Sequence, residues 1–228
     1  VIMSNKIRNP KDMKTLNQTI FREYDIRGKY PEDLNPSSIR SIAFSIAKKC
    51  KAESIDSLVI GRDGRLSGPE LIKILEAELN NNGISTENIG IVTSPLLYFA
   101  AKKSATLSGI MLTGSHNPKN YNGIKMVIND QPISGKEIYE GISSKPSSFN
   151  QNQAVRKNLN VVQTYVNEIV NSFSSIHKKI VVDCGNGAAG EIAPYLFEKI
   201  GCGVIELFCE IDGNFPNHPA DPSEKSNL

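Results

Sequence analysis

One segment of the chain concentrates side chains that could bind or carry a phosphate. Residues 113–125 combine hydroxyl, amide, imidazole and ammonium groups, and they follow an apolar run at 109–112. Gly114 permits unusual backbone angles directly before Ser115, and Pro118 stiffens the turn after it. Such a turn would lift the Ser115 hydroxyl out of the sheet edge, and successive backbone N–H groups could form an anion-binding concavity. The residues alone leave a phosphate site and an ordinary polar turn equally open.

The elements that must position this segment alternate between strand-like and helix-like patterns. Apolar residues at helical spacing predict helices, and short apolar runs between polar turns predict buried strands. The expected helices cover residues 35–50, 67–81, 94–103, 161–173 and 188–200. The expected strands cover residues 57–60, 89–92, 107–112, 123–129, 179–183 and 204–208. This order predicts an α/β fold with a mixed, mostly parallel sheet sandwiched by helices.

Two unusual loops follow strands of this predicted sheet, at 61–67 and 113–122. Ligands gather at the carboxyl ends of strands in such folds, so we expect both loops to lie near a site. The polar composition of residues 146–158 predicts a linker. It separates a first domain at 21–145, preceded by an N-terminal extension at 1–20, from a partial second α/β domain of similar type at 159–228. The second domain has too few strands to complete a sheet, so we expect the chain to be a fragment.

The composition narrows the class of protein. Hydrophobic side chains make up 39% and charged ones 22%, which is typical of a globular protein. A net charge of +2 without a basic cluster argues against nucleic acid as a partner. No apolar run is long enough for a membrane span or a signal peptide, so we expect no membrane partner and a cytoplasmic location. The four cysteines favour reduced thiols over disulfides or zinc.

Five ordered segments resemble the α-D-phosphohexomutase family, and five ordered matches are far more specific than one. The serine loop, with its Gly114 variant, is most similar to the phosphomannomutase/phosphoglucomutase branch. The segments read Phe21-Arg22-Glu23-Tyr24-Asp25-Ile26-Arg27-Gly28, Gly61-Arg62-Asp63-Gly64-Arg65, Thr113-Gly114-Ser115-His116-Asn117-Pro118 with Tyr121-Asn122-Gly123-Ile124-Lys125, Asp183-Cys184-Gly185-Asn186-Gly187-Ala188-Ala189-Gly190, and Gly213-Asn214-Phe215-Pro216-Asn217-His218. The resemblance runs from about Phe21 to the end of the chain and implies a phosphoglucomutase-like first domain.

The resemblance implies that Ser115 is phosphorylated in the resting enzyme and passes its phosphoryl group to a hexose monophosphate. The resulting hexose bisphosphate turns around and returns its other phosphate to Ser115, so the 1-phosphate and 6-phosphate of mannose or glucose interconvert. Phosphoserine adds roughly −1.5 to −2 charges. Arg27, Lys125 and a bound Mg²⁺ would neutralise this charge, and the phosphoserine would itself be one Mg²⁺ ligand.

The resemblance also assigns roles to individual side chains. The expected catalytic residues are Ser115, Lys125 and Arg27. The expected contacts to substrate or phosphate are Tyr24, His116, Asn117 and Arg62. Lys125 is an acid/base or a phosphate contact, His116 supports the loop or contacts phosphate, and Arg62 faces the cleft or pairs with Asp63. Asp183 and Gly185 are expected to shape the second domain, and His218 has no expected role.

Three parts of the family pattern are not in the sequence: the Asp-x-Asp-x-Asp metal loop, the sugar-recognition loop and the C-terminal phosphate-binding domain. We therefore expect the chain alone to be inactive or nearly so, with hexose phosphates and bisphosphates as ligands and a monomer or weak homodimer as its state. Two alternatives stay open. One is a non-catalytic phosphosugar-binding module, and the other is a phosphoglucosamine mutase, whose usual loop has Ala where Gly114 stands.

Overall fold

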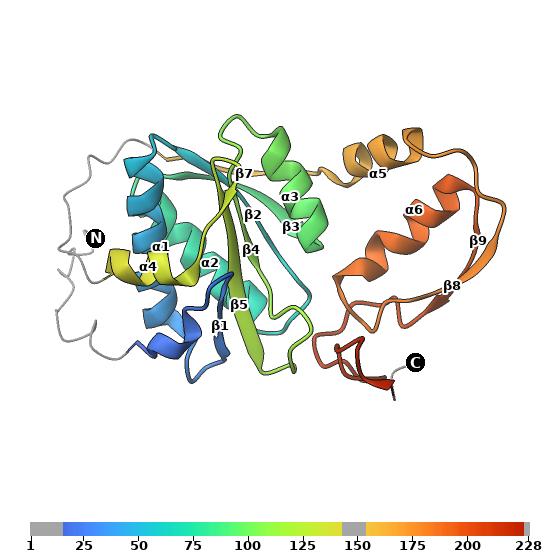
Figure 1. The fold of residues 1–228 in the computed structure, drawn as a ribbon, viewed down its shortest axis with the longest axis horizontal. Coiled ribbons are helices and arrows are strands. Elements are labelled where there is room, and N and C mark those ends of the chain that lie inside the picture. The colour runs from blue at the N-terminus through green and yellow to red at the C-terminus, as the bar shows by residue number, and fades with distance from the viewer. Residues whose placement is uncertain (1–15, 143–153, 226–228) are drawn as a thin grey trace, which may run out of the picture.

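Two α/β units lie side by side along the long axis of the molecule (Figure 1). The structure is a computed structural model, and it describes residues 16–142 and 154–225. The strands are β1 (Ile26–Lys29), β2 (Ser57–Arg62), β3 (Ser85–Ile91), β4 (Gly109–Leu112), β5 (Tyr121–Ile128), β6 (Gln131–Pro132), β7 (Arg156–Asn158), β8 (Lys179–Asp183) and β9 (Gly203–Leu207). The helices are α1 (Pro36–Ala52), α2 (Gly68–Asn81), α3 (Ser94–Lys103), α4 (Gly135–Ile142), α5 (Val162–Asn171) and α6 (Ala193–Ile200), with the 3-10 helices η2 (Gln18–Ile20) and η3 (Ala188–Glu191).

The first unit is a sheet with helices on both faces. Its strand order is β1-β5-β4-β2-β3-β7, and β6 pairs with β5. The centre is parallel, because β2 runs parallel to β3 and β4, and β7 is parallel to β3. Strand β5 is antiparallel to β1 and β4. Helices α1, α2 and α4 cover one face, and α3 covers the other (Figure 1). The predicted mixed α/β fold is confirmed.

The core divides at the sheet into two apolar clusters. The larger joins the sheet to α1, α2 and α4 and includes Ile26, Ile124 and Leu112, all fully buried. The smaller lies under α3 and includes Met111. Alternation along each strand decides which side chain enters which cluster, because successive residues point to opposite faces. This alternation also decides which polar side chains face α3.

The helix boundaries follow local chemistry. Asn35 caps α1: its side chain accepts from the backbone of Ser38, whose hydroxyl in turn accepts from the Asn35 backbone N–H. The predicted helix 188–200 is instead a 3-10 turn followed by α6. Proline at 194 lacks a backbone N–H and therefore favours the first turn of a new helix. Helix α6 ends at Ile200 and is capped by Gly201, whose left-handed φ of 107° suits glycine.

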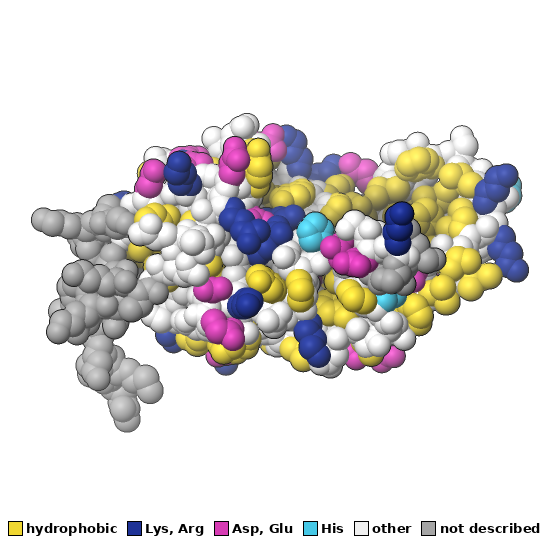
Figure 2. Space-filling view, turned by 60° about the horizontal axis from the view of Figure 1, so that its bottom comes forward, with side chains coloured by type: hydrophobic (Ala, Val, Ile, Leu, Met, Phe, Trp, Pro, Cys, Tyr) yellow, Lys and Arg dark blue, Asp and Glu magenta, His cyan; other side chains and the backbone are white. Residues whose placement is uncertain are grey.

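The second unit confirms the predicted strand–helix–strand order. Strands β8 and β9 pair in parallel, and α6 packs against β9. Apolar side chains remain exposed on the second unit (Figure 2), among them Val181, 58% exposed, and its strand partner Ile205, 43% exposed. Contacts between α3 and α5 join the two units: the rings of Phe99 and Tyr165 lie 5.2 Å apart between centroids.

Several elements were not predicted, and each lacks a strong pattern. Strands β1 and β6 and helix α4 are short, and β7 is exposed at all three residues. Strand β7 lies inside the range expected to be a linker, where it extends the sheet as an edge strand and Arg156 pairs with Glu76 at 3.0 Å. Residues 146–153 of that range lie outside the described residues. The expected N-terminal extension, 1–20, includes Ile20, but Ile20 is buried in the larger cluster and so packs as part of the first unit.

Among the described residues, no helix is long and apolar enough to span a membrane. The structure contains four free cysteines, Cys50, Cys184, Cys202 and Cys209.

Candidate active site

Ser115 lies in the loop that joins β4 to β5, at the carboxyl end of β4. One backbone hydrogen bond closes the base of this loop, where Thr113 N donates to Gly123 O at 2.9 Å, and another closes a turn within it, where Asn117 N donates to Gly114 O at 3.0 Å. Ser115 has a φ of 53°, in the left-handed region that non-glycine residues rarely adopt. Such a conformation persists where surrounding contacts over-determine it, and it is frequent at functional sites.

Asp63, from the loop after β2, braces the first half of the serine loop. Its Oδ2 accepts from Thr113 Oγ1 at 2.7 Å and from Gly114 N at 3.2 Å. Thr113 Oγ1 accepts in turn from Ser115 N at 2.9 Å. The N–H groups of Gly114 and Ser115 are therefore already occupied within the protein. The predicted concavity of successive backbone N–H groups is wrong for these two residues, because side chains take both donors.

Arg65 holds the second half of the serine loop, residues 115–121, through its backbone carbonyls. Its guanidinium donates to the backbone carbonyls of four residues at 2.7–3.0 Å and to Asp63 Oδ2 at 3.0 Å. The four carbonyls belong to Ser115, Asn117, Pro118 and Tyr121. Arg65 is only 1% exposed, and burial lowers the pKa of its guanidinium. Sequence reasoning assigned no role to Arg65, although it is the second arginine of the segment 61–65.

Arg65 also explains why residue 114 is a glycine. A Cβ on Gly114 would overlap the Arg65 guanidinium. The predicted reason, an unusual backbone angle at Gly114, is wrong, because the left-handed residue of this loop is Ser115. The glycine instead leaves room for the cation that holds the loop.

The second unit contributes a turn that follows β8. Gly185 N donates to Asp183 Oδ1 at 2.8 Å, and His218 Nε2 lies 3.2 Å from the same oxygen. His218 Nδ1 lies 2.8 Å from the carbonyl of Pro219. Both neighbours of the ring are acceptors, so the protonated ring, with two N–H donors, fits best. The Pro219 carbonyl and Asp183 accordingly raise the pKa of His218 above 6.5.

A cavity of about 380 Å³ lies between the two units. Its polar lining comes from both: Asp63, Thr113 and Ser115 from the first unit, and Asp183, Gly185 and His218 from the second. Of the seven side chains predicted at the site, Ser115 alone lines this cavity within the described parts of the chain. A second cavity of about 450 Å³ beside α3 is lined mainly by apolar residues, and none of the seven predicted site residues lines it.

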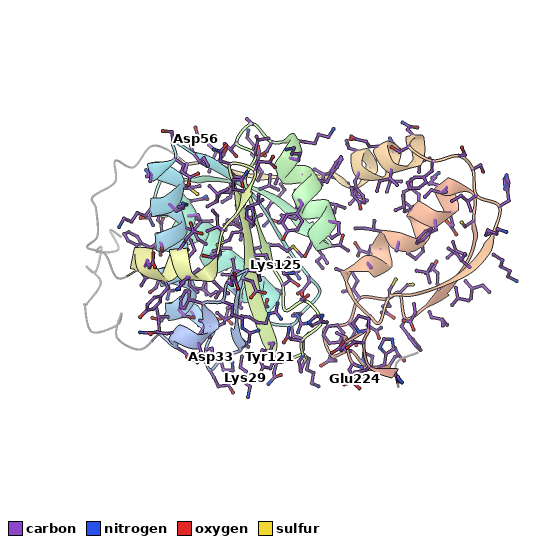
Figure 3. All side chains as sticks on the ribbon, viewed as in Figure 1. Lys29, Asp33, Asp56, Tyr121, Lys125 and Glu224 are labelled. Atoms are coloured by element: carbon purple, nitrogen blue, oxygen red, sulfur yellow. The ribbon has the colours of Figure 1, made fainter. Side chains whose placement is uncertain are left out.

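Strand register places Arg27 and Lys125 on one face of the sheet. Arg27 pairs with Gly123 across β1 and β5, and Lys125 lies two residues further along β5, where Figure 3 labels it. Lys125 also pairs with Met111, which belongs to the α3 cluster, so both cations face α3. Arg27 forms an ion pair with the buried Asp25, while its Nε is buried without a hydrogen-bond partner among the described residues.

The other four predicted residues do not line the cavity, and they differ in their contacts and exposure. Arg62 donates to the backbone carbonyl of Asp63 at 2.9 Å, and the ion pair of Asp63 is with Arg65 instead. Asn117 donates its amide to Gly114 O at 2.9 Å, so its side chain braces the loop. His116 is exposed at the loop surface, and Tyr24 is 80% exposed. Figure 2 shows Lys and Arg side chains gathered at the middle of one face, beside a histidine.

The described residues contain no group of three or more His, Cys, Asp or Glu side chains arranged to hold a metal ion. Two carboxylates line the cavity, and both are already engaged: Asp63 by Arg65 and Thr113, and Asp183 by Gly185 and His218. This donor set does not fit Mg²⁺, which prefers free carboxylate oxygens.

Comparison with known proteins identifies the family. The phosphoglucomutase/phosphomannomutase model for α/β/α domain I matches residues 18–148, and the model for α/β/α domain II matches residues 163–228. The chain belongs to this family. The resemblance expected from the five segments is confirmed, and the domain II match begins at residue 163, within α5.

Individual relatives agree with the family match. A phosphomannomutase/phosphoglucomutase of Pseudomonas syringae pv. tomato is 44% identical over 217 residues, which cover 93% of this chain and 46% of the relative. A probable phosphoglucosamine mutase of Methanosarcina barkeri is 31% identical, covering 91% and 48%. A family crystal structure from Burkholderia thailandensis has a TM-score of 0.87 at 39% identity, covering 93% of this chain and 49% of that one. The chain spans about half the length of the curated relatives it matches.

Proposed function

We propose that Ser115 carries the phosphoryl group in a phosphomutase reaction that interconverts the 1-phosphate and 6-phosphate of mannose or glucose. One observation carries the proposal: the Ser115 loop is fixed by Asp63 and Arg65 at the wall of a cavity that both units line. Relatives named phosphomannomutase/phosphoglucomutase support the choice of reaction. Their higher identity, compared with the probable phosphoglucosamine mutase, favours mannose and glucose over glucosamine.

The proposed reaction moves one phosphoryl group at a time. A hydroxyl of the hexose monophosphate attacks the phosphorus on Ser115, the bond from phosphorus to Ser115 Oγ breaks, and the hydroxyl loses its proton. The hexose bisphosphate then returns its other phosphoryl group to Ser115. Positioning and charge neutralisation contribute most in such transfers. A fixed backbone under Ser115 provides positioning, because its φ and its hydrogen bonds leave the loop little freedom.

The two cations on the α3 face are proposed to neutralise charge. Arg27 keeps one buried N–H donor without a protein partner among the described residues, so it can donate to a phosphate oxygen. Lys125 lies on the neighbouring strand β5, and its proposed role is that of an acid/base or a second phosphate contact. Mg²⁺ remains a prediction for the whole protein, with the Ser115 phosphate as its one predicted ligand in this chain. A monomer or weak homodimer and a cytoplasmic location also remain predictions.

The test is an assay of hexose 1-phosphate to 6-phosphate conversion by the gene product that contains these residues. Ser115→Ala should lower kcat by roughly three orders of magnitude or more, as the loss of a covalent nucleophile does. The matched control is Ser94→Ala, at a serine that lines the same cavity, and it should keep near-normal turnover. Normal turnover of Ser115→Ala would contradict the proposal. Sugar-phosphate binding by the unmutated protein without any turnover would favour the phosphosugar-binding module instead.

A further inference from the structure

Two cysteines meet where the parallel strands of the second unit end. Cys184 follows β8 directly, and Cys209 comes two residues after β9. The Cys209 thiol donates to Cys184 Sγ, with the two sulfur atoms 3.4 Å apart. The thiols are separated by 25 residues in sequence, so their contact is a product of the fold.

The backbone around the pair suits a disulfide. Cys184 N donates to Leu207 O at 3.0 Å, and Asn186 N donates to Phe208 O at 2.7 Å, so the two segments run alongside each other. Neighbouring strands lie about 4.8 Å apart, and the Cα atoms of a disulfide lie roughly 4.4–6.8 Å apart. An S–S bond is about 2.05 Å long, so the sulfur atoms need to approach by about 1.4 Å. Side-chain rotation can supply that movement.

Further contacts hold both segments in place. Asn186 Nδ2 donates to Glu210 O at 2.9 Å, and Asp212 N donates to Asn186 O at 3.0 Å. A Cβ on Gly190 would overlap the Cys209 carbonyl, so η3 lies directly on this segment. The thiols are thus held opposite each other before any reaction, and a covalent bond between them would restrict the folded chain little.

The pair differs from the other two cysteines in access and in partner. Cys184 lines the same cavity as Ser115, so a small oxidant that enters the cavity comes into contact with Cys184. Cys50 is fully buried in the core of the first unit. Cys202 lies at the end of α6, and no other thiol contacts it within the described residues.

We propose that Cys184 and Cys209 are a modification site, a dithiol that hydrogen peroxide, entering from the cavity that Cys184 lines, converts to a disulfide. The Cys184 thiolate attacks one peroxide oxygen, the O–O bond breaks, and hydroxide leaves and is protonated to water. The Cys184 sulfenic acid is then attacked by Cys209 Sγ, its S–O bond breaks, and a second water leaves. Two thiols are oxidised to one disulfide, and one peroxide is reduced to two waters.

The reaction is slow at neutral pH and faster in base. Burial, with the hydrogen bond from Cys209, raises the pKa of Cys184 to about 12. The thiolate is the nucleophile, and its fraction rises about tenfold per pH unit below the pKa. The oxidation rate therefore rises by about the same factor for each unit from neutral to mildly alkaline pH.

The test uses the 228-residue chain and does not depend on the role of Ser115, since only thiols are measured. The chain is treated with hydrogen peroxide and then unfolded in guanidinium chloride, its free thiols are alkylated, and peptides are mapped by mass spectrometry without reduction. We expect a single cross-link between the peptides of Cys184 and Cys209, reversed by dithiothreitol, with Cys50 and Cys202 alkylated. Cys202→Ser is the matched control and should form the same cross-link, while Cys209→Ser should form none.

Three outcomes would overturn the proposal. One is a cross-link that includes Cys202. Another is full alkylation of Cys184 and Cys209 after peroxide has oxidised a different thiol. The third is oxidation of Cys184 to the sulfinic acid while Cys209 stays free, which would show that Cys209 does not resolve the sulfenic acid.

Discussion

At the scale of single residues, Arg65 organises the loop that presents Ser115. One guanidinium, itself only 1% exposed, satisfies four backbone carbonyls and pairs with Asp63. Removing one partner of a buried ion pair leaves the other charge uncompensated, which costs far more than the pair contributes to stability when intact. Arg65 is therefore a positioning residue, because it acts on Ser115 through the backbone.

Arg65→Ala should lower the free energy of unfolding by about 3–5 kcal/mol, the usual cost of stranding a buried charge. Arg62→Ala is the matched control in the same segment. It removes a single hydrogen bond to a carbonyl, so it should cost about 1 kcal/mol. Urea denaturation monitored by circular dichroism measures both. Equal losses for the two variants would show that Arg65 does not hold the loop.

The residues of the site differ in how far the sequence could predict them. The segment around Ser115 was recognisable through its resemblance to the phosphohexomutase family, because the cluster of glycine, serine and proline after an apolar strand is equally typical of an ordinary polar turn. The role of Arg65 was not, because its carbonyl partners lie 50–56 residues away in sequence. The sequence could not explain why residue 114 is a glycine either, since the explanation depends on the same distant guanidinium.

At the scale of elements, strand register decides which cationic side chains lie on the α3 face of the sheet. Strand β1 brings Arg27 opposite Gly123, and β5 carries Lys125 two residues on, so the cations share the α3 face. Figure 3 shows Lys29 and Tyr121 together at the other end of these strands, where they are register partners. Strand β1 was not predicted, because Arg27, Gly28 and Lys29 interrupt any apolar pattern. Pairing with β5 forms this strand, and no local propensity indicates it.

The second unit has a pH-sensitive contact between the turn after β8 and the terminal loop. The pKa of His218 is raised in the folded protein, so its protonated form stabilises the fold. That contribution is fully present below the unfolded pKa near 6.5 and is lost as the pH rises through the raised value.

His218→Gln should therefore destabilise the protein more below about pH 6 than above about pH 8. Gln keeps a similar polar size but cannot become charged. Thermal unfolding of both proteins across this range gives the difference in midpoint, which should shrink as the pH rises. A difference that grows with pH would contradict the assignment of the Asp183 contact to the charged ring.

At the scale of the whole molecule, the cavity exists because two loops from different units touch. A Cβ on Gly213 would come within 2.7 Å of Gly64 O and Leu66 N, so these backbones lie in direct contact. The Phe215 ring lies 5.3 Å from the Arg65 guanidinium carbon. Arg65, which holds the Ser115 loop, is thus also in contact with the second unit. The sequence placed both segments in one family pattern but gave no indication that they meet.

Phe215→Ala should loosen this contact, because it removes a cation–π interaction of about 0.5–2 kcal/mol. Backbone amides of residues 211–218 should exchange hydrogen faster, while those of β4 and β5 should keep their protection. Phe173→Ala is the matched control, since Phe173 is 57% exposed. Unchanged exchange at residues 211–218 in Phe215→Ala would show that the two units are held together elsewhere, as between α3 and α5.

The central claim is that Ser115 is the residue that holds the phosphoryl group. The most direct measurement is to incubate the gene product that contains these residues with a hexose 1,6-bisphosphate and locate the phosphate by peptide mass spectrometry. The account predicts one phosphate, on Ser115, which leaves the protein when hexose monophosphate is added and appears as hexose bisphosphate. Phosphate on another residue, or phosphate on Ser115 that hexose monophosphate cannot remove, would contradict it.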